Sequence, residues 1–160
     1  MSDFVSTVNV DIDAQALSHK LEALVDEKTM LAVHKLLAKM CDPYVPYGET
    51  GLLSTQIEIT PEYVRYYAGS GDGGSYAHYQ YIGEVYGPNI PIIENGIIVG
   101  WRSPPGKGSK HPTGRRIQYS TNVHTQASAE WDKAMMREHG DEFKEQVKQI
   151  LLRRARELYG

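Results

Sequence analysis

Residues 13–40 read DAQALSHKLEALVDEKTMLAVHKLLAKM and contain neither glycine nor proline. Their apolar residues recur every three or four positions, which is the spacing of a stripe along one side of a helix. We therefore predict a long amphipathic helix with Asp13 as its N-cap and a break near residues 26–29. Pro43 and Pro46 end this helix, because a residue that precedes proline is driven out of the helical region.

The middle of the chain favours short strands. Apolar residues alternate with polar ones, and glycine and proline divide the segments. We predict strands over 52–59 and 62–68, joined as a hairpin through Thr60-Pro61, and a further strand over 97–101. Residues 75–82 are predicted to form two helical turns.

Helical spacing returns near the C-terminus. Ser128 is a candidate N-cap there, Gly140 allows a break, and a second helical segment runs to Leu158. Residues 103–116 are predicted to form a flexible basic loop. The order of helix, small antiparallel or mixed sheet with a long inserted loop, and C-terminal helices, without βαβ units, indicates an α+β fold in a single domain over 1–160.

The composition excludes several classes of protein. The 160 residues include 17 Lys plus Arg and 20 Asp plus Glu, a net charge of −3, which argues against a surface that binds nucleic acid throughout. The lone Cys41 has no partner for an internal disulfide. No apolar run is long enough to cross a bilayer and no secretion signal opens the chain, so we expect a soluble protein without a membrane partner.

No motif indicates catalysis. Gly69-x-Gly71-x-x-Gly74 matches the dinucleotide fingerprint, but the strand and full helix that this fingerprint needs are absent from the pattern. The six histidines have no metal-ligand spacing, and Cys41 is interpreted as a small buried hydrophobic residue. We predict no enzyme activity and no catalytic, cofactor-binding or metal-binding residues.

Two features predict contact surfaces. Seven of the eleven tyrosines lie between residues 63 and 86, and tyrosine is frequent at interfaces; ordinary packing on a sheet is the alternative. Between Glu94 and Glu130 there is no acid, a pattern that suits a phosphate backbone or an acidic protein; a solvated loop without a ligand is the alternative. The candidate interface residues are Tyr76, Tyr79, Tyr81 and Trp131, of which Trp131 is more readily a core residue, and the candidate basic contacts are Arg102, Lys107, Lys110, Arg115 and Arg116.

Four motifs in a fixed order are more informative than any one of them. They are Pro-Tyr-Val-Pro at 43–46, Gly-Glu-Thr-Gly-Leu-Leu at 48–53, Tyr-Ala-His-Tyr-Gln-Tyr-Ile-Gly at 76–83, and Ala127 with Trp131-Asp132 and Met135. Over residues 35–158 this order resembles the minor capsid proteins of tailed phages and prophages. More distantly it is similar to the head–tail connector and tail-completion proteins of siphophages.

The resemblance implies a structural protein without cofactor or turnover. It implies a ring, six- or twelve-fold, in the virion neck between the DNA-filled head and the tail, built in the host cytoplasm. The implied partners are further copies of the chain, the portal-side connector, the tail tube or terminator protein, and non-specific DNA in the channel. The alternative hypothesis is a small nucleic-acid-binding or nuclease domain that uses His78 or His111 with the basic loop.

Overall fold

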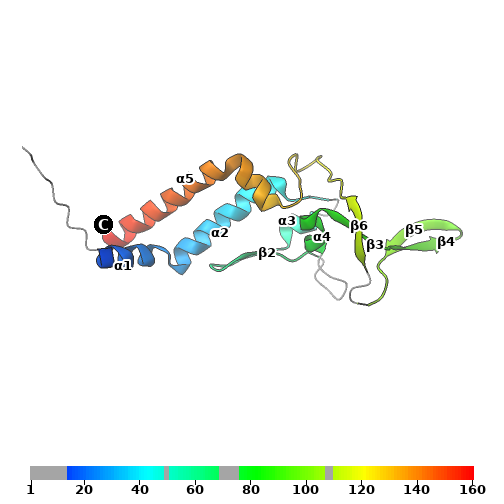
Figure 1. Ribbon diagram of the computed structural model, residues 1–160, viewed down its shortest axis with the longest axis horizontal. Coiled ribbons are helices and arrows are strands. Elements are labelled where there is room, and N and C mark those ends of the chain that lie inside the picture. The colour runs from blue at the N-terminus through cyan, green and yellow to red at the C-terminus, as the bar shows by residue number, and fades with distance from the viewer. Residues whose placement is uncertain (1–13, 49–50, 69–75, 107–109) are drawn as a thin grey trace, which may run out of the picture.

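The computed structural model shows an elongated molecule, with long helices at one end and short strands at the other (Figure 1). Asp13, the Gly69–Gly74 segment and Lys107 are predicted features that lie outside the described residues. The structure describes residues 14–48, 51–68, 76–106 and 110–160.

The helical end consists of α1 (Ala14–Leu24), α2 (Glu27–Cys41) and α5 (Trp131–Tyr159). The break predicted near residues 26–29 is confirmed, because Asp26 caps α2 by accepting a hydrogen bond from the backbone N–H of Thr29 at 2.8 Å. The helix α2 packs along α5 (Figure 1). After α2 a single 3-10 turn, η1 (Asp42–Tyr44), contains the first of the two prolines that were predicted to end the helix.

Charged side chains join the start of α2 to the end of α5. The guanidinium of Arg154 donates to the carboxylate of Asp26, and it also donates to Glu157 at 2.9 Å. The ammonium of Lys28 donates to the same Glu157 carboxylate at 2.8 Å. These four side chains fix the register of the two helices at the helical end of the molecule (Figure 1).

The predicted hairpin through Thr60-Pro61 is confirmed. Strand β1 (Ile57–Ile59) pairs antiparallel with β2 (Val64–Tyr66). The first half of the predicted strand is wrong, because Leu52–Thr55 form a helical turn, α3. Gly51 starts this turn in the left-handed region, with φ +63°, and a Cβ there would lie 2.8 Å from the Tyr47 ring, so the position favours glycine.

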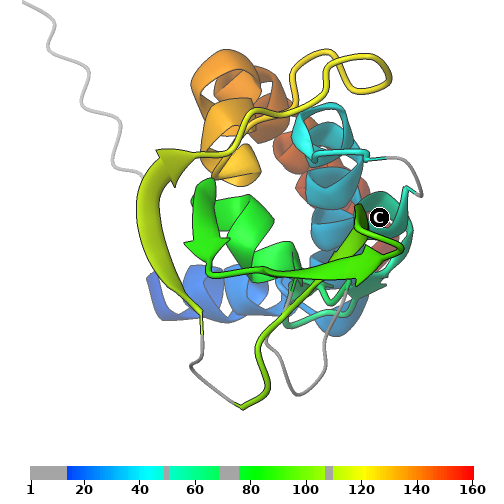
Figure 2. The ribbon, with the colours of Figure 1, turned by 90° about the vertical axis from the view of Figure 1, so that its right-hand side faces the viewer.

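The helical turns predicted over 75–82 are confirmed as α4 (Tyr76–Ile82). Two further antiparallel pairs follow, and each forms its own two-stranded sheet. Strand β3 (Glu84–Gly87) pairs with β6 (His111–Arg116), and β4 (Ile90–Glu94) pairs with β5 (Ile97–Arg102). Seen from the strand end of the molecule, these pairs lie in front of the helices (Figure 2).

The predicted loop over 103–116 is therefore wrong for its last six residues, which form β6. Hydrogen bonds to β3 hold this strand in place. The Thr113 hydroxyl donates to the backbone oxygen of Val85 at 2.6 Å, and the Gly114 N–H donates to the Glu84 carboxylate at 3.0 Å. All six residues of β6 are exposed, and the sequence HPTGRR contains no alternation of apolar and polar residues. The strand therefore had no signal in the sequence.

Two predictions concern the last helix. Ser128 is not its N-cap, because Glu130 occupies that position with φ +44°. The buried Ser128 hydroxyl has no hydrogen-bond partner among the described residues. The break in α5 falls at His139, next to the predicted Gly140. The α+β class is confirmed.

The core lies where the helices meet the first strands. Its buried residues are Cys41, Tyr44, Val45, Leu53, Ala68, Ala77, Trp131, Ala134 and Met135.

Candidate functional site

A β-hairpin projects from the strand end of the molecule (Figure 1). It consists of β4 and β5, and Asn95 and Gly96 connect the two strands. Both connecting residues have positive φ, +52° and +79°. A two-residue turn with this backbone matches the natural twist of paired strands, and asparagine followed by glycine is its preferred sequence. The turn therefore fixes which residues of the two strands lie opposite each other.

The pairing of β4 and β5 sorts their side chains onto two faces. Residues opposite each other in an antiparallel pair share a face, and successive residues alternate. Ile93 lies opposite Ile98 and Pro91 lies opposite Trp101, on one face. The register shifts between Ile92 and Ile93, which brings these two pairs onto the same side. We call Pro91, Ile93, Ile98 and Trp101 the apolar face of the hairpin.

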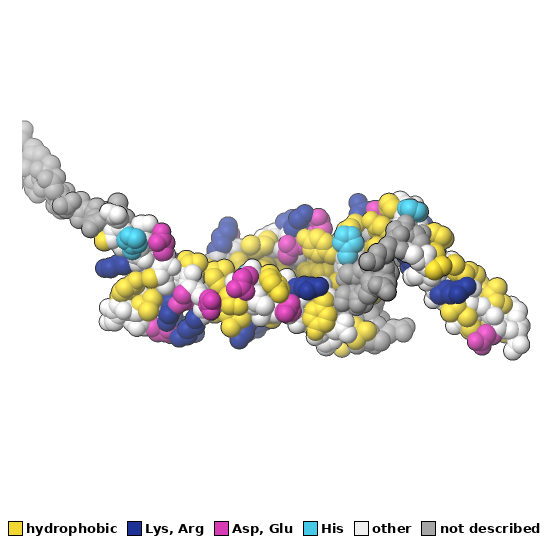
Figure 3. Space-filling view, turned by 90° about the horizontal axis from the view of Figure 1, so that it is seen from below, with side chains coloured by type: hydrophobic (Ala, Val, Ile, Leu, Met, Phe, Trp, Pro, Cys, Tyr) yellow, Lys and Arg dark blue, Asp and Glu magenta, His cyan; other side chains and the backbone are white. Residues whose placement is uncertain are grey.

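The apolar face is open to solvent. Ile93 and Trp101 are each 60% exposed and Ile98 is 52% exposed. Apolar side chains cover much of the projecting hairpin in the space-filling view (Figure 3). Adjoining exposed apolar side chains of this kind are typical of surfaces that contact other macromolecules.

The opposite face of the hairpin is mixed. The pairs Glu94 with Ile97 and Ile90 with Arg102 place one acid and one base there, beside Ile92. The Arg102 side chain is exposed at the base of the hairpin. The two faces therefore differ in character although they belong to the same two strands.

The predicted basic residues lie near the hairpin. Arg115 and Arg116 are exposed on β6, and Arg116 lies opposite Glu84 of β3. Lys110 immediately precedes β6 and is half-buried. Of the predicted basic residues that the structure describes, three thus present exposed cations at the strand end.

The predicted tyrosines occupy different environments. Tyr76 is exposed at the start of α4, while the Tyr79 ring lies 4.6 Å from that of Tyr86. Tyr81 points inward: its ring packs edge-on against Trp131 with centroids 4.9 Å apart, and its hydroxyl donates to Asp132 at 2.8 Å. Burial, followed by the hydrogen bond to Asp132, raises the pKa of Tyr81 to about 12.

Trp131 is a core residue of the isolated chain, with 4% of its surface exposed. Tyr66 packs against its other side, with ring centroids 5.1 Å apart. Tyr81 and Trp131 therefore support the fold, whereas Tyr76 remains available on the surface. Their aromatic cluster also forms a wall of the pocket described next.

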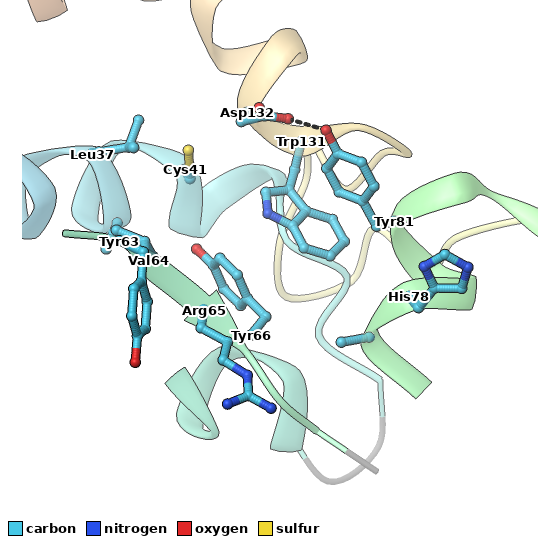
Figure 4. A pocket seen from close by; sticks show the side chains of 12 residues that line it. Leu37, Cys41, Tyr63, Val64, Arg65, Tyr66, His78, Tyr81, Trp131 and Asp132 are labelled. Atoms are coloured by element: carbon cyan, nitrogen blue, oxygen red, sulfur yellow. Dashed lines mark hydrogen bonds between the residues drawn. The ribbon is translucent and has the colours of Figure 1, made fainter. Parts of the chain in front are cut away.

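An open pocket of about 730 Å³ lies between α2, β2, α4 and the first turn of α5. Figure 4 shows the aromatic rings of Tyr66, Tyr81 and Trp131 around it, with Arg65 and His78 on neighbouring elements. Most of its surface is apolar. The residues that line it are Leu37, Ala38, Cys41, Tyr63, Val64, Arg65, Tyr66, Ala77, His78, Tyr81, Trp131 and Asp132.

Three polar groups of this pocket, those of Asp132, Cys41 and Tyr66, are hydrogen-bonded or kept neutral by burial. The Asp132 carboxylate accepts the hydrogen bond from Tyr81. Burial raises the pKa of the Cys41 thiol to about 12, so the nucleophilic thiolate is scarce at neutral pH. Burial also raises the pKa of Tyr66. The pocket is therefore suited to receiving apolar or aromatic groups.

The described residues contain neither a metal-binding cluster nor a membrane-spanning helix. Within the ranges that the structure describes, no three His, Cys, Asp or Glu side chains are grouped so that they could hold a metal ion. No helix in this part of the chain is both long enough and apolar enough to cross a membrane.

The strand predicted over 97–101 is confirmed as β5, but sequence reasoning missed its partner β4, and with it the hairpin, and also missed the pocket. Asn95-Gly96 between two isoleucine-rich runs was the signal for the hairpin, but Pro91 obscured its first strand. The pocket has no local signal, because its walls come from four elements that are distant in sequence. Comparisons of the chain with protein-family models, with curated proteins and with solved structures find no match.

Proposed function

We propose that the protein is a structural component of a tailed-phage or prophage neck. In this role it is a minor capsid, head–tail connector or tail-completion protein, and it assembles into a ring that joins the DNA-filled head to the tail. The apolar face of the β4–β5 hairpin carries the proposal, because four adjoining apolar side chains on a projecting hairpin suit contact with other protein chains. The order of the four sequence motifs supports the phage assignment.

The rest of the molecule supports a role through contact surfaces. The pocket wall is mainly apolar and its thiol is neutral at physiological pH, so it is better suited to packing than to acid–base or nucleophilic chemistry. The exposed cations Arg102, Arg115 and Arg116 suit docking on an acidic surface of an adjacent ring, with non-specific contact to channel DNA as a further use. The adjacent rings in this proposal are the portal-side connector and the tail tube or terminator.

Native mass spectrometry over a concentration series, combined with a titration of double-stranded DNA, tests the proposal. We expect the chain to form oligomers that close at a fixed copy number, six or twelve, without tight DNA binding by the monomer. The matched control is the Ile93→Glu variant, which places a charge on the apolar face and should remain smaller under the same conditions.

A second candidate is favoured by one observation, the acid-free stretch between Glu94 and Glu130 with its exposed arginines. It is a nucleic-acid-binding or nuclease domain that uses His78 or His111. This candidate requires a monomer that binds DNA with steep salt dependence. That result, with metal-dependent cleavage of the DNA, would overturn the neck assignment.

A further inference from the structure

The β4–β5 hairpin lacks a covering layer within the described part of its own chain. All residues from Pro91 to Val99 are exposed, and the sheet has two strands only. An isolated two-stranded hairpin is marginally stable in water and gains stability when another surface packs against it. The apolar face is therefore available to a surface from outside the described part of the chain.

The pocket between α2, β2, α4 and α5 is the complementary feature. It is concave and open, and its walls carry Tyr66, Tyr81 and Trp131. Its volume of about 730 Å³ lies in the range of pockets that enclose a drug-sized ligand. This is room for an indole ring together with a neighbouring aliphatic side chain, the combination that the apolar face presents at Trp101 and Ile98.

One copy of the chain cannot bring the two surfaces together. The hairpin extends away from the helices at the end of the molecule, whereas the pocket lies between elements nearer its centre (Figures 1 and 4). A projecting surface that fits a pocket elsewhere on the same molecule produces a head-to-tail contact between copies. Repetition of such a contact closes a ring when the rotation allows closure.

The charges around the two surfaces are complementary. The pocket meets α5 at its first turn, with Asp132 and Arg65 in its lining, and residues 130–145, which begin at this turn, contain six acids against three bases. Strands β5 and β6 belong to the stretch between residues 94 and 130 that contains no acid, and they expose Arg102, Arg115 and Arg116, whereas β4 ends with the one acid of the hairpin, Glu94. Complementary potentials of this kind orient two proteins as they meet and fix the register of their contact.

We propose that the apolar face of the hairpin of one copy docks into the α2–β2–α4–α5 pocket of a second copy. This inference rests on the proposed function and specifies the contact that builds the ring. Trp101, Ile98 and Ile93 are the inserting side chains, and the aromatic wall of Tyr66, Tyr81 and Trp131 receives them. The cations at the hairpin base then face the acidic half of α5.

Chemical cross-linking between two single-site variants tests this contact. Pro91→Cys places a thiol on the apolar face and keeps Ile93, Ile98 and Trp101, while His78→Cys places one at the exposed rim of the pocket. The two full-length variants are mixed and treated with a short bismaleimide. Cys41 is buried and its thiol has a pKa raised to about 12, so it reacts slowly and can stay in place.

The matched control is Ile92→Cys, one residue further along β4 on the opposite face. We expect the Pro91→Cys and His78→Cys chains to cross-link several-fold more than the Ile92→Cys and His78→Cys chains. Mass labelling of one variant distinguishes this product from links between identical variants. Raised salt should reduce the yield, because exposed charges are then screened.

Three results would overturn the inference. Predominant links between two Pro91→Cys chains would show that hairpins meet each other. Closed oligomers without the expected link would show that the ring uses other surfaces, and the proposed neck function would stand. A hairpin protected from hydrogen exchange only after addition of a different neck protein would replace the second copy by that protein as the occupant.

Discussion

The two tryptophans of the chain occupy opposite environments. Trp131 is 4% exposed and lies between the rings of Tyr66 and Tyr81. Trp101 is 60% exposed on the projecting hairpin. A large aromatic side chain is stabilising when it is buried, and it is typical of protein interfaces when a surface carries it. Trp131 therefore stabilises the fold, whereas Trp101 is available for contact with a partner.

Alanine substitutions should reveal this difference. Trp131→Ala removes a packed core residue and should lower the free energy of unfolding by about 3 to 5 kcal/mol, the usual cost of removing a buried aromatic. Trp101→Ala should change it by no more than about 0.5 kcal/mol, as for most exposed sites. Urea unfolding of both variants measures the difference, and equal losses would contradict the assignment of Trp131 to the core and Trp101 to the surface.

The Asp26 carboxylate couples stability to pH. Its hydrogen bond from the Thr29 N–H, with the nearby Arg154, holds its pKa below the ordinary value of 3.8. The ionised form is therefore favoured by folding, so its stabilisation is complete above that value and is lost as the pH falls through the lowered folded pKa. Asp26→Asn keeps a capping oxygen but removes this charge.

We expect Asp26→Asn to melt at a lower temperature than the wild type at neutral pH, with the gap narrowing in acid below the ordinary pKa of the carboxyl. Melting curves across an acid titration measure this. Asp141→Asn is the control, because Asp141 is fully exposed and pairs only with Lys144 at 3.5 Å; it should leave melting nearly unchanged. A gap that stays constant with pH would contradict the role of the charge.

At the scale of elements, local signals predicted what local interactions decide. The break in the helix near residues 26–29 and the turn at Thr60-Pro61 were predicted, and both depend on local interactions: Asp26 caps α2, and a proline favours a turn. Strand β6 was not predicted, since its exposed, polar residues are held by hydrogen bonds to a distant β3. Leu52–Thr55 looked like a strand, but the positive φ of Gly51 starts a turn there.

The candidate site was only partly predictable for the same reason. Tyr81 and Trp131 were noted from their residue types, but only the folded chain shows that they support one pocket wall. The exposed arginines near the hairpin were predicted from the absence of acids. The apolar face depends on the register of β4 and β5, and the shift of that register beside Ile92 has no signal in the sequence.

The basic segment can be tested as one element. Replacing Lys107, Lys110, Arg115 and Arg116 by serine should change the melting temperature little, because Arg115 and Arg116 are exposed and exposed charges contribute little to stability. We expect the same variant to assemble more weakly at low salt, with a smaller difference at high salt. Differential scanning fluorimetry and light scattering measure the two effects. Normal assembly by this variant at low salt would remove the segment from the contact surface.

The whole molecule is elongated and differs in character along its length (Figure 1). One end is a helical pair closed by ion pairs between Asp26, Lys28, Arg154 and Glu157. The other end is a thin, apolar hairpin flanked by arginines. Between them lies an open aromatic pocket. A subunit with distinct and complementary surfaces is what a head-to-tail ring requires.

Assembly through the apolar face is tested most directly by sedimentation velocity over a concentration series of the wild type, Ile93→Glu and Ile97→Glu. The two isoleucines are 60% and 66% exposed and lie on opposite faces of one hairpin, so the substitutions match in chemistry and differ in face. We predict that the wild type and Ile97→Glu associate as concentration rises, while Ile93→Glu stays monomeric with an unchanged melting temperature. Association of Ile93→Glu equal to that of Ile97→Glu, or a wild type that stays monomeric and binds DNA, would contradict assembly through the apolar face.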